Sequence, residues 1–86
     1  MYHLYILECK DKTLYCGITT NIEKRLQEHN GVNGSKLGAK YTKGRRPVKL
    51  VYSETFKNRS LALKAEYRVK WLTRKEKLQL IKFKKT

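Results

Sequence analysis

The stretch that decides the fold is LYILECKDKTLYCGITTNIEKRLQEH, residues 4–29. Two runs in and around it, residues 2–9 and 13–19, are rich in aromatic and β-branched side chains and predict two β-strands. The three polar residues between these runs predict the turn of a hairpin. Tyr5 and Tyr15 share a face of that hairpin only if the residue numbers of any two residues paired across it have an even sum. Such a register requires a loop of odd length or a bulge near the turn.

A helix is expected to follow the hairpin, over about residues 21–30. Residues 20–23 have the composition of a capping box, and Asn30 followed by glycine is a typical helix end. Arg25 and His29 are four residues apart, so they lie one turn apart on the same side of this helix.

The rest of the chain predicts one further strand and two further helices. The strand covers residues 48–56, and Asn58 or Ser60 caps a helix that runs to about Leu72. A second capping box, at residues 73–76, opens the last helix.

The order strand, strand, helix, strand, helix, helix predicts an α+β fold. In this fold the helices pack on a small three-stranded sheet, mixed or antiparallel. At this length we expect one domain over residues 1–86, ending in a frayed basic tail at residues 83–86.

Residues 31–47 show no periodicity and are expected to form a long basic loop. They contain four of the five glycines and no acidic residue. Loops this long in a small domain are usually binding loops or disordered segments. Tyr41 lies among the cations of the loop, where it either stacks on an unpaired base or folds onto the core. The cations are Lys36, Lys40, Lys43, Arg45 and Arg46.

The composition points to a polyanionic partner. Twenty-one Lys and Arg residues against seven Asp and Glu residues give a formal net charge of +14. Counterion release then favours nucleic acid, with an anionic membrane surface second and a merely basic protein as the plain alternative. No apolar run is long enough to cross a bilayer and no signal peptide is evident, so we expect a cytoplasmic protein without a membrane segment.

Cys9 and Cys16 are expected to be reduced, half-buried thiols that face each other across the hairpin.

Glu66 is the acidic residue whose position is most informative. It falls in the same angular sector as the apolar stripe of its helix, which consists of Ala62, Ala65, Val69 and Leu72. A carboxylate there is costly unless it meets a cation, and either a salt bridge to Arg or Lys or a bound metal ion would satisfy it. Mg²⁺ needs only one or two carboxylates, because water and phosphate oxygens complete its shell. We expect ordinary surface charges at Glu8, Glu28 and Glu54.

Four further side chains suit chemistry on a phosphodiester, although each also has an ordinary explanation. Arg25 suits paired hydrogen bonds to a phosphate, although a lone arginine is more commonly an ordinary helix-surface residue. His29 suits a proton shuttle or a phosphate donor, yet a histidine near a helix C-terminus also complements the helix dipole. Tyr5 and Tyr15 are also typical of the packed aromatic residues of a hairpin.

Taken together, these side chains resemble the signature of the GIY-YIG nuclease superfamily. The matching residues are Tyr5, Tyr15, Arg25, His29 and Glu66. Residues 4–5 correspond to the end of the first half of the motif and residues 15–17 to its second half. The basic loop at residues 38–47 is similar to that of small bacterial members, which are relatives of the nuclease domain of branch-cutting endonucleases. The chain departs from the motif at His3, which replaces its first glycine, and at Cys16, which replaces Ile or Val.

The resemblance implies a metal-dependent endonuclease that hydrolyses phosphodiester bonds in DNA and is directed by structure rather than by sequence. Glu66 would hold one Mg²⁺ or Mn²⁺ ion, and Arg25 would clamp the scissile phosphate. Tyr5 would be the general base, with its pKa lowered by neighbouring cations and with Tyr15 as its positioning partner. His29 would orient the tyrosine or donate to the phosphate. Substrate would be bound by Lys36, Lys40, Tyr41, Lys43, Arg45 and Arg46.

Two other functions fit the same sequence. A nucleic-acid-binding module without catalysis would use the net charge and the basic loop equally well, and a requirement for metal separates the two functions. A basic accessory domain for a protein partner is the third possibility, and it predicts little salt-sensitive affinity for DNA.

Overall fold

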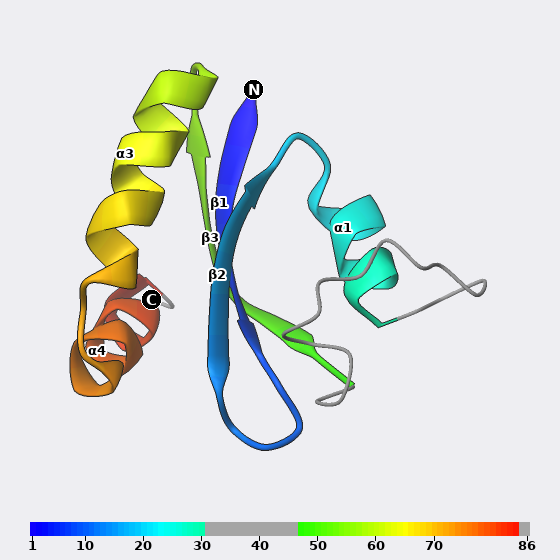
Figure 1. Cartoon of the computed structure of the whole chain (residues 1–86), viewed down its shortest axis with the longest axis vertical. Helices are drawn as coiled ribbons and strands as arrows, with labels where there is room; N and C mark the ends of the chain where they lie inside the picture. Colours follow the sequence, from blue (N-terminus) through cyan, green and yellow to red (C-terminus); the bar gives the residue numbers. More distant parts are fainter. Residues whose placement is uncertain (31–46, 85–86) are drawn as a thin grey trace.

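The computed structural model describes residues 1–30 and 47–84, which form three strands and three helices (Figure 1). In chain order these are β1 (Tyr2–Glu8), β2 (Leu14–Thr19), α1 (Ile22–His29), β3 (Lys49–Phe56), α3 (Arg59–Lys70) and α4 (Arg74–Lys84). The predicted α+β class and the predicted order of elements are confirmed. No helix in the described part of the chain is long and apolar enough to cross a membrane.

The three strands form one antiparallel sheet in the order β2-β1-β3. Helix α1 lies on one face of this sheet, and α3 and α4 lie on the other (Figure 1). Because β1 is central and covered on both faces, the four consecutive residues Leu4–Leu7 are all buried. Strand β2 is an edge strand, so on its outer side no other described strand pairs with its backbone groups.

The register of the hairpin brings Tyr5 and Tyr15 to the same face. Tyr5 pairs with Gly17 and Leu7 pairs with Tyr15, so paired residue numbers add to an even sum, 22, as a shared face requires. The turn makes this possible with a positive φ of 69° at Lys12, whose backbone N–H donates to the carbonyl of Cys9 at 2.9 Å.

Each face of the sheet has its own buried cluster. The cluster on the α3 side is Leu4, Ile6, Tyr52 and Val69, with Cys16 and Ala65 packed against it. The cluster on the α1 side is Tyr5, Leu7, Cys9 and Val48, with Tyr15 and Leu26 packed against it. The two free thiols therefore lie on opposite faces, and the prediction that Cys9 and Cys16 face each other is wrong. The reason is the even register, which places Cys16 beside Ile6.

Helix α1 begins one residue later than a capping box at residues 20–23 would place it. The N-cap is Asn21, whose Oδ1 accepts from the backbone N–H of Lys24 at 3.0 Å. Thr19 accepts from the backbone N–H of Asn21 and holds it in place, so Thr20 is left outside the cap.

The caps of the other two helices follow the sequence. Asn58, one of the two predicted residues, caps α3 by accepting from the backbone N–H of Leu61 at 3.0 Å. Thr73 and Glu76 form the predicted capping box of α4, each accepting from the backbone N–H of the other at 3.2 and 2.9 Å.

Asn30 joins the end of α1 to the start of β3. Its Nδ2 donates to the carbonyl of Val48 at 3.1 Å, and its Oδ1 accepts from the N–H of Val48 at 2.7 Å. Residues 31–46 lie between these two positions, so the pair of hydrogen bonds fixes the points at which that segment leaves and rejoins the described fold.

Candidate functional site

Three aromatic rings meet on the α1 face of the sheet. Tyr5 comes from β1, Tyr15 from β2 and His29 from the last turn of α1. The ring centroids are 6.3 Å apart for the two tyrosines, 6.0 Å for Tyr5 and His29, and 5.0 Å for Tyr15 and His29. We call these three residues, together with Arg25, the tyrosine cluster. The fold thus brings together four of the side chains that the sequence singled out.

The hydroxyl group of Tyr5 is the centre of the tyrosine cluster. It lies 3.1 Å from Nε2 of His29, which is completely buried, and it is also hydrogen-bonded to the side chain of Arg25. A guanidinium group only donates, so the Tyr5 oxygen accepts from Arg25. The Tyr5 hydroxyl hydrogen is then available to Nε2 of His29. One buried phenol in this way links the arginine to the histidine.

The expectation that neighbouring cations bring the pKa of Tyr5 below its ordinary value is wrong, because burial outweighs the lowering by Arg25. Burial raises the pKa of Tyr5 to about 12, because the hydrogen bond from Arg25 does not compensate for the loss of hydration of a phenolate. Only 2% of Tyr5 is exposed, whereas Tyr15 is half-buried and has access to solvent. Burial and a raised pKa make Tyr5 a poor general base, and Tyr15 is the tyrosine of the cluster that water can reach.

Gly17 explains why the second half of the motif needs a glycine. A Cβ atom at this position would lie 2.5 Å from the hydroxyl oxygen of Tyr5 and 2.7 Å from its Cζ. The glycine therefore lets the ring of the paired tyrosine lie flat against the backbone of β2.

Arg25 is held by two partners, one of which the sequence analysis missed. Its Nη1 donates to Oε1 of Glu28 at 3.0 Å, and the Glu28 side chain is only 15% exposed. Burial alone would lower the pKa of Arg25, but the hydrogen bonds to Glu28 and Tyr5 outweigh it and the net shift is upward. The i,i+3 spacing of Arg25 and Glu28 was the available signal, and Glu28 is a half-buried partner rather than the ordinary surface charge expected.

Glu66 lies on the other side of the sheet from the tyrosine cluster. It belongs to α3. Burial raises the pKa of the Cys16 thiol on β2 to about 12, and the nearby carboxylate of Glu66 is the second cause of this rise. The Glu66 side chain is 17% exposed, and its ion pair with Lys70 is loose, at 3.8 Å from Nζ to Oε1. Since Tyr15 and Cys16 are neighbours on edge strand β2, Glu66 and the tyrosine cluster flank the same edge.

The chemistry of Glu66 suits a hard divalent cation. A carboxylate that is only loosely paired can exchange Lys70 for an ion whose other ligands are water and phosphate oxygens. No group of three or more His, Cys, Asp or Glu side chains in the described residues could enclose a metal ion. A site built on Glu66 would therefore be an open one that depends on substrate for part of its shell.

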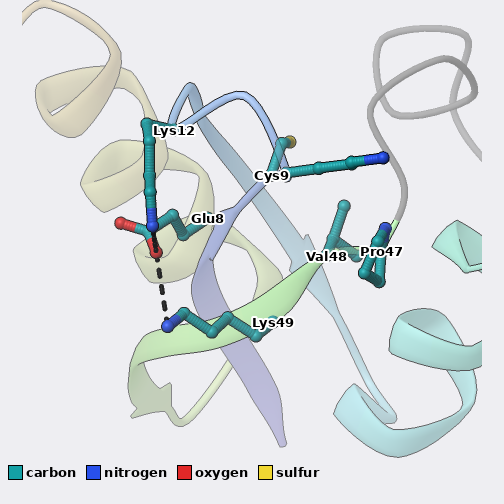
Figure 2. A pocket seen from close by; sticks show the side chains of 7 residues that line it. Glu8, Cys9, Lys12, Pro47, Val48 and Lys49 are labelled. Carbon is teal, nitrogen blue, oxygen red and sulfur yellow. Dashed lines mark ion pairs between the residues drawn. The ribbon is translucent and has the colours of Figure 1, made fainter.

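A basic pocket of about 200 Å³ opens at the turn end of β1 (Figure 2). Lys12 and Lys49 lie 3.9 and 3.4 Å from the carboxylate of Glu8, which pairs with both. Cys9 and Val48 line this pocket and also belong to the buried cluster of Tyr5, whereas Glu8 falls on the opposite face of β1 with Leu4 and Ile6, so the pocket lies across the end of the sheet. Four residues along a strand separate Tyr5 from Cys9, a span of ~13 Å.

The predicted substrate-binding residues of the basic loop lie outside the described residues. They are Lys36, Lys40, Tyr41, Lys43, Arg45 and Arg46.

Comparison with known proteins agrees with this geometry. Residues 1–79 match the family model described as the GIY-YIG catalytic domain. The chain is 62% identical over 80 residues to a UPF0213 protein of Syntrophus aciditrophicus, and the match covers 93% of this chain and 88% of the relative. It is 57% identical over 84 residues to a UPF0213 protein of Clostridium perfringens, and that match covers 98% of this chain and 86% of the relative. A solution NMR structure of a UPF0213 protein from Bacillus halodurans is similar with a TM-score of 0.62 and 44% identity, covering 98% of this chain and 86% of that one. The solution NMR structure of protein EF2693 from E. faecalis is similar with a TM-score of 0.61 and 40% identity, covering 95% of this chain and 84% of that one. With its signature tyrosines, arginine and histidine gathered on one face of the sheet, the chain belongs to the GIY-YIG catalytic domain family.

Proposed function

We propose that this protein is a metal-dependent endonuclease that hydrolyses phosphodiester bonds in DNA. The observation that supports this most is the tyrosine cluster, in which a buried Tyr5 hydroxyl links Arg25 to His29 beside edge strand β2. The hydrogen bonds of Arg25 to Glu28 and Tyr5 hold its guanidinium group in one orientation, which suits paired hydrogen bonds to a phosphate.

In the proposed mechanism the phenolate form of Tyr15, rather than Tyr5, accepts the proton of the attacking water and afterwards releases it to solvent. Tyr15 is half-buried and reaches solvent, whereas Tyr5 is buried with a pKa of about 12 and stays protonated. Tyr5 is then a positioning residue, because its hydroxyl holds Arg25 and His29 in place. Arg25 would donate paired hydrogen bonds to the scissile phosphate and stabilise the charge that grows on it.

Glu66 is the residue that would hold Mg²⁺ or Mn²⁺. When bound, the ion would polarise the phosphoryl oxygen and stabilise the leaving oxygen. Because Glu66 and the tyrosine cluster flank edge strand β2, a substrate backbone lying over that edge would be within reach of both sets of side chains.

Basic residues at the turn end of β1 suit the flanking phosphates. The pocket beyond Cys9 is bordered by Lys10, Lys12 and Lys49, against a single acid, Glu8. The loop at residues 31–47 would add its own cations. Such contacts are to the backbone, so they favour recognition of shape over sequence.

The free thiols agree with a reducing, cytoplasmic location.

The test is a cleavage assay on labelled single-stranded, duplex, flap and branched DNA with Mg²⁺, Mn²⁺ or EDTA. Wild type is expected to cut only with metal, and Glu66→Gln is expected to bind but not to cut. Glu23→Gln, the same change at an exposed acid of α1, is the matched control and should cut normally. Equal cutting by wild type and Glu66→Gln would remove Glu66 from the mechanism.

The alternative is a nucleic-acid-binding module on the same scaffold. The net charge of +14 supports it as well as it supports an enzyme. Tight, salt-sensitive binding by wild type without cutting under any metal condition would favour this alternative.

A further inference from the structure

Helix α3 presents two aromatic side chains to solvent on the side away from the core. Tyr67 is 65% exposed and Trp71, the C-cap residue, is 73% exposed. Their ring centroids are 6.1 Å apart and the rings meet edge to face, with an angle of 64° between their planes. Successive helix residues turn by ~100°, so the point midway between these two residues lies opposite Val69, which is buried in the core. Neither ring supports the fold by burial.

The surroundings of this aromatic pair are basic. Lys64 is exposed and lies one turn before Tyr67 on the same outer side of the helix. Helix α3 as a whole has four cations against one acid, Glu66, which pairs with Lys70. A protein partner that covered the pair would have to bring acidic groups with its apolar ones, whereas a nucleic acid strand has a π-face and a phosphate in every residue.

We infer that Tyr67 and Trp71 form a stacking platform for an unpaired base of the nucleic acid substrate. Aromatic rings beside cations bind single strands by stacking, whereas the bases of an intact duplex are already stacked on one another. This inference rests on the proposed function and narrows its substrate class to DNA with unpaired bases next to the cleavage site.

The position of the pair along α3 fits that role. Glu66, the proposed metal ligand, directly precedes Tyr67 in the helix and lies ~100° away around it. A strand that crosses the edge of β2 to reach Glu66 would meet the aromatic pair next. The platform would thus hold the substrate on the α3 side, while the tyrosine cluster lies on the α1 side.

Trp71 is the only tryptophan of the chain, so its fluorescence reports on the platform directly. With EDTA present, titration with an oligothymidylate is expected to quench this fluorescence, and a blunt duplex with the same number of phosphates is expected to leave it nearly unchanged. Equal quenching by both, or by neither, would overturn the inference. Because the measurement needs neither metal nor turnover, a protein that cuts DNA without this quenching keeps the proposed function and loses only the platform.

Variants provide a second readout, the anisotropy of a labelled oligothymidylate. Trp71→Leu is expected to weaken single-strand binding ~5- to ~100-fold, with Trp71→Phe close to wild type. Phe83→Leu changes an aromatic residue of α4 with the same exposed fraction, 73%, and serves as the control. Equal weakening by Trp71→Leu and Phe83→Leu would overturn the platform. So would a blue shift of Trp71 emission with protein concentration alone, because it would identify a second copy of the chain as the occupant.

Discussion

Gly17 lies so close to Tyr5 that the tyrosine ring occupies the space of a side chain at position 17. The missing Cβ atom would sit 2.5 Å from the Tyr5 hydroxyl oxygen. The same hydroxyl is hydrogen-bonded to His29 and to Arg25. The packing of Tyr5 against Gly17 therefore also positions the side chains of Arg25 and His29. A change at Gly17 on β2 is therefore expected to disturb the hydrogen-bonded side chains of the tyrosine cluster.

Gly17→Ala should therefore damage both stability and activity. The added methyl group must push the ring of Tyr5 away from β2, and overpacking of this kind costs ~1–3 kcal/mol. Urea unfolding should show the loss in the free energy of unfolding. Thr20→Ala, at an exposed residue between β2 and α1, should change it by less than ~0.5 kcal/mol. A Gly17→Ala protein as stable as wild type would mean that the ring moves freely.

The raised pKa of Tyr5 predicts a loss of stability at alkaline pH. Below pH ~10 the phenol is neutral in both the folded and the unfolded chain. Between the ordinary value of 10.0 and the folded value of about 12, only the unfolded chain ionises, so the free energy of unfolding must fall as the pH rises. Tyr5→Phe removes this contribution and should show a shallower decline over the same interval.

The comparison must be made as a difference between two proteins. Cys16 and Tyr52, whose pKa values burial also raises to about 12, contribute to the alkaline decline in both. Subtracting the Tyr5→Phe curve from that of wild type cancels them together with the lysines. Parallel curves from pH 9 to pH 12 would contradict the assignment of a raised pKa to Tyr5.

The two tyrosines are expected to differ in kinetics. If Tyr15 accepts the proton of water, Tyr15→Phe should lower kcat ~10²- to ~10⁴-fold and leave DNA binding unchanged. Tyr5→Phe should lower kcat less, because its ring still packs and only the link between Arg25 and His29 is lost. Cleavage rates at saturating DNA, measured on variants with matched unfolding midpoints, would decide this. Greater damage from Tyr5→Phe would return the role of base to Tyr5.

The local elements were predictable because their signals lie close together in the sequence. The hairpin, the α4 capping box and the stripe of Ala62 and Val69 are patterns of period two or 3.6 with cap residues at fixed offsets. The shared face of Tyr5 and Tyr15 could be stated only as a condition on register, because the turn geometry at Lys12 depends on a positive φ that few lysines adopt.

The properties that depend on tertiary burial could not be predicted. Cations near Tyr5 suggested a lowered pKa, but the ring is enclosed between β2 and α1, and the cost of desolvation is larger than the effect of Arg25. Glu28 looked like a surface charge because its burial depends on where α1 lies against the sheet. That Glu66 and the tyrosine cluster flank one edge strand likewise follows only from strand order.

Asn30→Ala tests how much the hydrogen bonds between Asn30 and Val48 stabilise the fold, without changing any residue of the tyrosine cluster. The change removes both hydrogen bonds to Val48, a buried residue, and should cost ~1–3 kcal/mol. Asn30→Asp keeps the acceptor for the Val48 N–H but loses the donor, so its stability should be intermediate. Urea midpoints at a constant m-value would test this order. A fully stable Asn30→Ala protein would show that other contacts hold the two ends.

Arg25→Lys tests whether the guanidinium group acts by its charge or by its shape. Lysine keeps the positive charge but cannot donate to Glu28, to Tyr5 and to a phosphate from one rigid plane. The expected result is a fall in kcat of ~10²- to ~10³-fold, the range found when one transition-state donor is lost, with affinity for DNA nearly unchanged. Arg59→Lys, at an exposed position at the start of α3, is the control and should behave as wild type. If Arg25→Lys retains full turnover, charge alone suffices and the hydrogen bond between Arg25 and Tyr5 serves stability rather than catalysis.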